Sequence, residues 1–202
     1  MENNATTIAI NKNAEDNSIR SASSISGDNM SASGTNLSVE KLGEIAKFSL
    51  PAGWTAASAE NSQWAQAGYS RDFSPSDAPQ AVLSIFHRGC SVPQKSFHDF
   101  TQILEEPAHK LNSEELDSIA QVLSKLADDE AFEIYNAEIN VINGRKILAV
   151  DGSWKLSALL FHGIFIKSDN QEVQEIFFEA APQDFAKHIN EVRQSIAQIV
   201  WS

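Results

Sequence analysis

The chain has 202 residues, of which 42% are hydrophobic and 21% charged, and its formal net charge is −12 at pH 7. These values indicate one globular domain with an extra segment and exclude a fully disordered chain. No apolar run reaches the length of about 18 residues that a membrane-spanning helix needs. The negative charge disfavours nucleic acid and anionic lipid as partners.

The N-terminal region, residues 1–38, is rich in Ser, Asn, Ala, Thr and Gly. Such a stretch buries too little apolar area to offset its ordering entropy, so we expect a flexible tail. The folded domain is expected to span residues 39–202. The tail shows no basic segment followed by an apolar core, which is the pattern of a secretory signal. Cys90 is the one cysteine, so no internal disulfide is possible. We therefore expect a cytoplasmic protein, although a form already trimmed of its signal would look the same.

The first part of the domain predicts strands. A strand over Ile45–Leu50 ends at the turn residues Pro51–Gly53, and two further strands are expected over Gln66–Phe73 and Gln80–His87.

An acidic helical middle is expected over residues 96–127. Ser96 with Asp99 is typical of a helix start, and Asn112 or Ser113 is expected to cap a second helix. Its apolar stripe consists of Leu116, Ile119, Ala120, Leu123 and Leu126.

Residues 132–178 predict paired strands. Asn143-Gly144 is the strongest hairpin signal, because both central positions of a type I′ turn need positive φ. A second hairpin is expected near Ser168–Asn170. The buried set changes parity after Ile134, which predicts a β-bulge near Tyr135–Asn136.

The last element is an amphipathic helix from about Pro182 to Val200. Strands, two helices, hairpins and a closing helix indicate an α+β fold, with helices packed on a largely antiparallel sheet. No Gly-rich phosphate loop or other cofactor motif is present, so we expect no cofactor.

Three segments resemble the PsbP-like fold group, which includes the photosystem oxygen-evolving subunit and a Ran-binding import factor. They are KFSLPAGW (Lys47–Trp54), NGRKILAVDGS (Asn143–Ser153) and the C-terminal unit Gly163–Trp201. The resemblance covers about half of the chain. It implies an α/β/α sandwich and a non-catalytic, protein-binding role, and it carries over no binding residue.

The candidate binding surface is acidic. Between Glu105 and Glu138 lie ten carboxylates and two lysines, Lys110 and Lys125. A field of this sign attracts a basic protein surface, although solvated helix faces have the same composition. The tentative partner-binding residues are Glu114, Glu115, Asp117, Asp128, Asp129 and Glu130, with the turn aromatics Trp64 and Trp154.

Metal and catalytic sites are not expected. The five histidines (His87, His98, His109, His162 and His188) lack the spacing of a zinc site and are interpreted as surface or core residues. Asp128–Glu130 lacks the spaced ligands of a calcium loop. Cys90 near His87 is the one nucleophile candidate, without a hydrolase signature around it.

The first functional hypothesis is therefore a non-catalytic module that binds a basic protein. The alternatives are a small hydrolase or ligand-binding protein that uses Cys90 and His87, and a tethered structural subunit, immunity protein or secretion chaperone.

Overall fold

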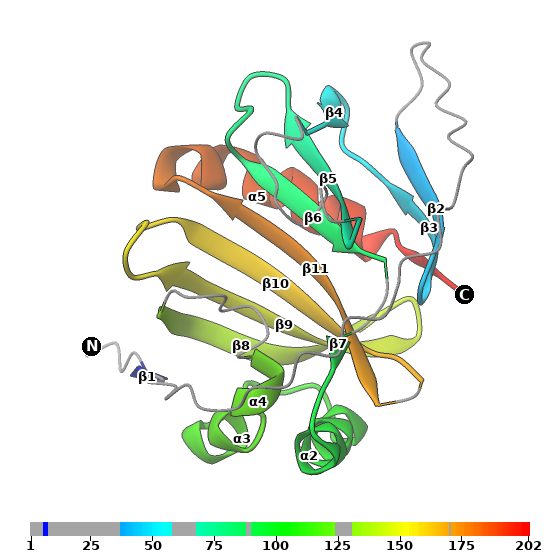
Figure 1. The fold of residues 1–202 in the computed structure, drawn as a ribbon, viewed down its shortest axis with the longest axis vertical. Helices are drawn as coiled ribbons and strands as arrows, with labels where there is room; N and C mark the ends of the chain where they lie inside the picture. The colour runs from blue at the N-terminus through cyan, green and yellow to red at the C-terminus, as the bar shows by residue number, and fades with distance from the viewer. Residues whose placement is uncertain (1–5, 8–36, 58–67, 88–89, 124–130, 170) are drawn as a thin grey trace.

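The computed structural model describes residues 6–7, 37–57, 68–87, 90–123, 131–169 and 171–202, without the side chains of Thr6, Thr7 and Cys90. Figure 1 shows one large sheet with helices on both of its faces. Each strand pairing within it is antiparallel. The α+β class and the sandwich of helices around an antiparallel sheet are confirmed.

The large sheet has the strand order β1-β8-β9-β10-β11-β6-β5-β4, and β7 also pairs with β11. The strands are β1 (Thr6–Thr7), β4 (Trp54–Ala56), β5 (Ser70–Pro75), β6 (Val82–Phe86), β7 (Cys90–Ser91), β8 (Phe132–Ile142), β9 (Arg145–Trp154), β10 (Leu160–Lys167) and β11 (Glu172–Ala180). A smaller sheet has the order β12-β3-β2, with β2 (Ser38–Leu42), β3 (Ile45–Ser49) and β12 (Val200–Trp201).

The helices divide between the two faces of the large sheet. α2 (Gln94–Glu105), α3 (Ser113–Ser118) and α4 (Ala120–Leu123) form a helical layer on one face, and α5 (Pro182–Ala197) lies on the other (Figure 1). Because successive strand residues point to opposite faces, Leu148 enters the core under the helical layer, whereas Ala149 enters the core under α5. The sheet is therefore buried on both sides.

Each core is built from large apolar side chains. The α5 core includes Phe48, Leu83 and Phe178, and α5 contributes the buried residues Ile189, Val192 and Ile196. Burying each aliphatic side chain of this kind contributes about 1.5–3 kcal/mol before entropy costs. The apolar face of the predicted amphipathic helix thus holds α5 to the sheet.

Both predicted hairpin features around β8 are confirmed. Asn143 and Gly144 have φ values of 48° and 83°, as a type I′ turn requires. The β8–β9 register shifts between Ile134 and Asn136, so Tyr135 is the extra residue of the bulge. The second hairpin joins β10 to β11, with Gln171 at φ 61°.

Two helix predictions in the middle of the chain are wrong in detail. α2 begins at Gln94 after Pro93, so Ser96 and Asp99 lie inside the helix, where Asp99 pairs with Lys95. The second helix is interrupted at Ile119. Ser118 Oγ hydrogen-bonds to the Glu115 carbonyl, and such a side-chain bond competes with the helical one. Asn112 does cap α3, in a capping box with Glu115.

The last helix is shorter than predicted. α5 ends at Ala197, and Val200–Trp201 pair with β3 instead of continuing the helix. The indole of Trp201 donates to the Ile142 carbonyl at 2.7 Å, and this bond fixes the turn away from the helix axis.

The N-terminal region contains one described element. Thr6 and Thr7 pair with Ile134 and Glu133 of β8, which was not expected of a tail. The other residues of the stretch up to 36 lie outside the described part of the chain, so its predicted flexibility stays a prediction.

Candidate functional site

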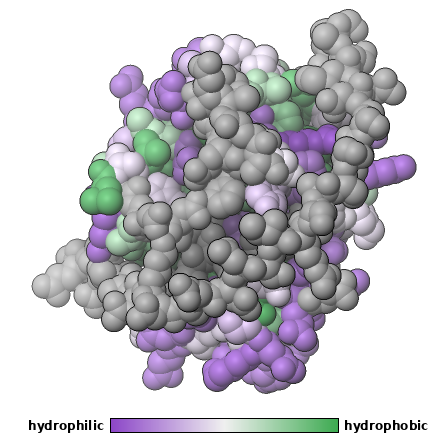
Figure 2. All heavy atoms as spheres, viewed as in Figure 1, coloured by the Kyte–Doolittle hydropathy of each residue, from purple (hydrophilic) through white to green (hydrophobic). Residues whose placement is uncertain are grey.

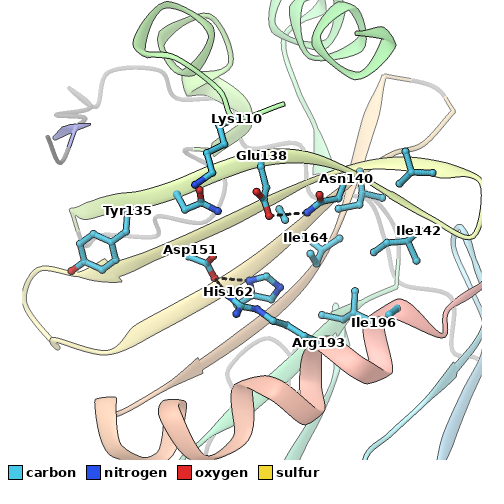
Figure 3. A pocket seen from close by; sticks show the side chains of 15 residues that line it. Lys110, Tyr135, Glu138, Asn140, Ile142, Asp151, His162, Ile164, Arg193 and Ile196 are labelled. Atoms are coloured by element: carbon cyan, nitrogen blue, oxygen red, sulfur yellow. Dashed lines mark hydrogen bonds and ion pairs between the residues drawn. The ribbon is translucent and has the colours of Figure 1, made fainter. Parts of the chain in front are cut away.

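A groove runs between α5 and β8 on the α5 face of the sheet (Figure 3). α5 packs mainly on β10, β11 and β3, and the groove lies between this helix and β8. The groove has a volume of about 620 Å³. Its polar lining includes Asn136, Glu138, Asn140, Asp151, His162 and Arg193, and its apolar lining includes Ile147, Ala149, Ile164 and Ile196.

The strand register brings three polar side chains into one row. Asn136 on β8 lies opposite Asp151 on β9, and Asp151 lies opposite His162 on β10. Directly paired residues project from the same face of a sheet. The next residue in the row is the core residue Phe178, so the groove begins where the apolar core under α5 ends.

Asp151 is the centre of the polar end. His162 Nδ1 lies 2.7 Å from Asp151 Oδ1, and Arg193 donates to the same oxygen at 2.8 Å. His162 is only 6% exposed, whereas the side chain of Arg193 is about half exposed. A buried histidine is thus held by a carboxylate that an arginine from α5 also binds.

These contacts determine the tautomer of a neutral His162. A carboxylate only accepts hydrogen bonds, so Nδ1 carries the proton and donates it to Asp151. The second nitrogen, Nε2, then has a free lone pair, and among the described residues it has no hydrogen-bond partner. Such a nitrogen can accept a hydrogen bond or a proton from a bound molecule.

The same contacts keep Asp151 ionised. Burial raises the pKa of Asp151, but the hydrogen bond from His162, the positive charge of its ring when protonated, and the charge and hydrogen bond of Arg193 outweigh it. The pKa of this carboxyl therefore lies below its ordinary value.

The outer wall of the groove comes from β8. Glu138 accepts a hydrogen bond from the Asn140 amide at 3.0 Å. Lys110 lies opposite Glu138 as an isolated bridge, and the backbone of His109 and Leu111 bonds to β8 on either side of it. The segment around Lys110 thus closes the open edge of β8.

The predicted acidic residues lie on the helical layer, on the other face of the sheet from the groove. Glu114 and Asp117 are exposed on α3. Glu115 is occupied, because its carboxylate accepts from the Asn112 backbone and contacts His109 at 2.8 Å. Asp128, Asp129, Glu130 and Trp64 lie outside the described residues.

Trp154 was predicted to lie in a turn, but it is the last residue of β9. It is 8% exposed and packs against Phe132, Phe161 and Phe177. Its indole donates to Glu179 Oε2 at 3.1 Å. Most of the surface of this ring is therefore buried in the core and is not exposed to a partner.

The alternative site at His87 and Cys90 is described only in part. Burial lowers the pKa of His87, and the charge of Arg71 lowers it further. Cys90 pairs with Val173 through its backbone as part of β7, and its side chain is outside the described part. A catalytic role for the pair stays a prediction.

His109 belongs to a cluster that its sequence spacing did not predict. Potential metal-ligand atoms of Glu106, His109 and Glu115 lie within 4.8 Å of one another. The His109 ring contacts the Pro107 carbonyl through Nδ1 at 2.7 Å and Glu115 through Nε2. Both partners are acceptors, so a doubly protonated ring satisfies them without a metal ion.

Known proteins resemble this chain at the level of structure and not of sequence. No protein-family model and no curated protein matches the chain. Among solved structures, the chain is similar to the solution structure of cyanobacterial PsbP (CyanoP) from Synechocystis sp. PCC 6803, with a TM-score of 0.49 and 11% identity. The match covers 86% of this chain and 99% of that one. Cyanobacterial PsbP belongs to the fold group that the sequence resembles. We infer no function from this similarity. No helix among the described residues is long and apolar enough to cross a membrane.

Proposed function

We propose that the chain is a non-catalytic protein-interaction module that binds a basic protein partner through the acidic surface of its helical layer. This acidic surface consists of Glu105, Glu106, Glu114 and Asp117, with Asp128, Asp129 and Glu130 as its predicted extension. Hydrophilic side chains gather along the lower edge of the molecule in Figure 2, where Figure 1 places α2 and α3.

The observation that carries the proposal is that Glu114 and Asp117 of α3 are exposed and without an ion-pair partner among the described residues. Lys146 donates to the backbone carbonyls of Glu105 and Glu106, and His109 contacts Glu115, so neither of these basic side chains binds Glu114 or Asp117. The carboxylates of Glu114 and Asp117 are therefore available to a basic surface, which they attract over a distance of about 10 Å at ordinary salt.

The test is a capture experiment with matched charge changes. The variant Glu114→Gln/Asp117→Asn removes two negative charges from the acidic surface. The control Glu40→Gln/Asp169→Asn removes two exposed charges from other elements. A basic protein retained at low salt and released at high salt, by the wild type and the control but not by the α3 variant, supports the proposal. Equal capture by all three proteins overturns it.

The identity of the captured protein separates the narrower alternatives. A cognate toxin indicates an immunity protein, an exported effector indicates a secretion chaperone, and a subunit of a larger assembly indicates a structural role. A structural subunit tethered by residues 1–38 would lose assembly on deletion of that segment while its domain stays folded.

The enzymatic alternative has its own test. Cys90 should react with a thiol reagent at neutral pH no faster than a free thiol if the protein is non-catalytic. Faster reaction that depends on His87 would favour the hydrolase hypothesis.

A further inference from the structure

We propose that the polar end of the groove between α5 and β8 binds an uncharged sugar ring. The apolar face of the sugar stacks on Tyr135. Its hydroxyl groups bond to Asn136, Asp151 and His162. This inference goes beyond the proposed function, because the groove and the acidic surface lie on opposite faces of the sheet and share no residue.

The first argument is the β-bulge, which brings two neighbouring side chains to one face of the sheet. Ile134 and Ala137 both enter the core under the helical layer. Tyr135 and Asn136, which lie between them, therefore both project to the α5 face, where they line the groove. In a regular strand, two successive side chains point to opposite faces. Bulges commonly re-aim side chains beside active sites, and here the bulge places an aromatic ring next to an amide.

The second argument is the position of the Tyr135 ring. Tyr135 is 56% exposed, and its hydroxyl lies 2.5 Å from Ser153 Oγ on β9. This contact holds the ring at the rim of the groove (Figure 3). The face of an aromatic ring is electron-rich, so it attracts the C–H groups of a sugar, whose hydrogens carry partial positive charge. The ring thus offers one anchored stacking surface.

The third argument is the free hydrogen-bonding capacity beside this ring. Both hydrogen bonds of the Asp151 side chain to described residues use Oδ1, so Oδ2 is free to accept another. In the neutral ring of His162, Nε2 is also a free acceptor within the described part of the chain. The amide of Asn136 offers both donors and an acceptor. A sugar hydroxyl both donates and accepts, so a set of hydroxyls matches these groups.

The charge of the lining favours an uncharged ligand. Two acidic side chains, Glu138 and Asp151, and two basic ones, Lys110 and Arg193, line the groove. Arg193 donates to Asp151, and Lys110 lies opposite Glu138. An ion of either sign loses hydration on entry and gains no net attraction from a balanced lining. A neutral hydroxylated molecule exchanges its water for the polar atoms of the groove at a smaller cost.

The walls of the groove disfavour a flat apolar ligand. Ile147, Ala149 and Ile164 are at most 5% exposed, so they offer little apolar surface. A nucleobase that stacks on Tyr135 would therefore leave its second face in water. A sugar ring has an apolar C–H face and a polar periphery, which matches one aromatic ring beside polar groups. The groove volume of about 620 Å³ lies within the range of about 300–1,000 Å³ typical of ligand sites.

The experiment titrates glucose, galactose and mannose separately into the full chain labelled with ¹⁵N, and backbone amide shifts are followed. We expect at least one sugar to shift the amides around Tyr135, Asn136 and Asp151 saturably, with a Kd on the order of 1–10 mM. Two control compounds are titrated in the same way. Tetrahydropyran-2-methanol keeps the ring with a single hydroxyl, and cytosine is a flat base without a sugar. Each should bind at least about tenfold more weakly.

The methyl glycoside of the sugar that binds best separates two sources of the ligand. Retained binding supports a site for the end of a glycan, whose first carbon is substituted. Binding of the free sugar alone supports a site for a monosaccharide.

Matched variants test the role of Tyr135. Tyr135→Ala removes the stacking surface and should weaken the sugar about tenfold, whereas Tyr135→Phe keeps the ring and should change its affinity by less than about threefold. Tyr69→Ala removes a similarly exposed tyrosine outside the groove and should leave the affinity unchanged.

Four results would each overturn the inference: no saturable shift at the groove with any of the three sugars, equal binding of tetrahydropyran-2-methanol, equal binding of cytosine, or an unaffected Tyr135→Ala variant. The titrations of the wild type need no substitution, so they test the inference even if a variant is destabilised. None of these results depends on partner capture. A failure of the α3 variant to lose its partner would therefore overturn the proposed function and leave the sugar site standing.

Discussion

Asn143 in the β8–β9 turn donates its side-chain amide to the backbone carbonyl of Ile199, 2.7 Å away. The same amide lies 3.2 Å from the carbonyl of Ala197, the last residue of α5. The hairpin that forms the outer wall of the groove is thereby tied to the end of the helix that forms the inner wall. The residue that makes the type I′ turn possible also sets the width of the groove at this end.

Replacing Asn143 should separate these two roles. Asn143→Gly keeps the positive φ accessible but removes the tie to α5, so we expect a loss of about 1 kcal/mol in unfolding free energy. Asn143→Ala also strains the turn and should cost more. Urea unfolding of both variants checks the order. A glycine variant less stable than the alanine variant would contradict it.

Gln174 should be among the most sensitive polar residues of the core. It is fully buried, its amide donates to the carbonyls of Leu42 and Phe86, and its oxygen accepts from the Glu44 backbone. Gln174→Leu leaves these three backbone groups without a partner, and each orphaned group costs about 1–3 kcal/mol.

We therefore expect Gln174→Leu to lower the unfolding free energy by about 3 kcal/mol or more. The control is Gln194→Leu, an exposed position on α5, which should change stability by less than about 0.5 kcal/mol. Similar effects of the two substitutions in guanidinium unfolding would refute the role of Gln174.

Asp151 should make stability depend on pH in the acidic range. Its pKa is below the ordinary value of 3.8, because the bonds from His162 and Arg193 outweigh burial. A depressed carboxyl pKa contributes stability that is fully present above the unfolded-state value and is lost as pH falls through the folded-state value. Asp151→Asn should therefore cost about 1–3 kcal/mol at pH 7 and progressively less below pH 4.

The measurement is the difference in unfolding free energy between wild type and Asp151→Asn at several pH values. A difference that stays constant from neutral to strongly acidic pH would show that the charge of Asp151 does not stabilise the fold.

His109 should titrate above its ordinary pKa of 6.5. The hydrogen bond to the Pro107 carbonyl raises its pKa, and the bond to Glu115 adds to this. A raised histidine pKa contributes stability that is present below pH 6.5 and is lost as pH rises through the folded-state value. The NMR titration of the His109 ring should show this midpoint, and Glu115→Gln should lower it. A midpoint at or below 6.5 in the wild type would contradict the two contacts.

Local features of the fold could be predicted from the sequence, because neighbouring residues determine them. Asn143-Gly144 specifies its own turn, and the parity change after Ile134 specifies the bulge. The break at Ile119 could not be predicted from the apolar stripe, since a hydroxyl bond from Ser118 to Glu115 competes with the helix there. Likewise, α5 stops because residues distant in sequence bind its end.

The groove was missed for a related reason. Asp151 and His162 are eleven positions apart, and only the register of β9 against β10 places them in contact. That register depends on the connection after Trp154, where Ala158 has a positive φ of 57°. Alanine rarely adopts positive φ, so the sequence did not predict this turn. The available signal was a histidine at a core-facing position of an apolar strand, which was interpreted as a structural residue. The same connection places Trp154 in the core instead of a turn.

The strand order has a consequence for how the chain assembles during synthesis. β6 pairs with β11, and Ile85 lies opposite Ile176, far along the chain. On the ribosome, β4, β5 and β6 emerge long before the strand that joins them to the rest of the large sheet. Pairings of such separation slow folding and prolong the exposure of unpaired strands to other chains. Until β11 has left the exit tunnel, β4, β5 and β6 can pair only with one another, and the edge of β6 that pairs with β11 stays open.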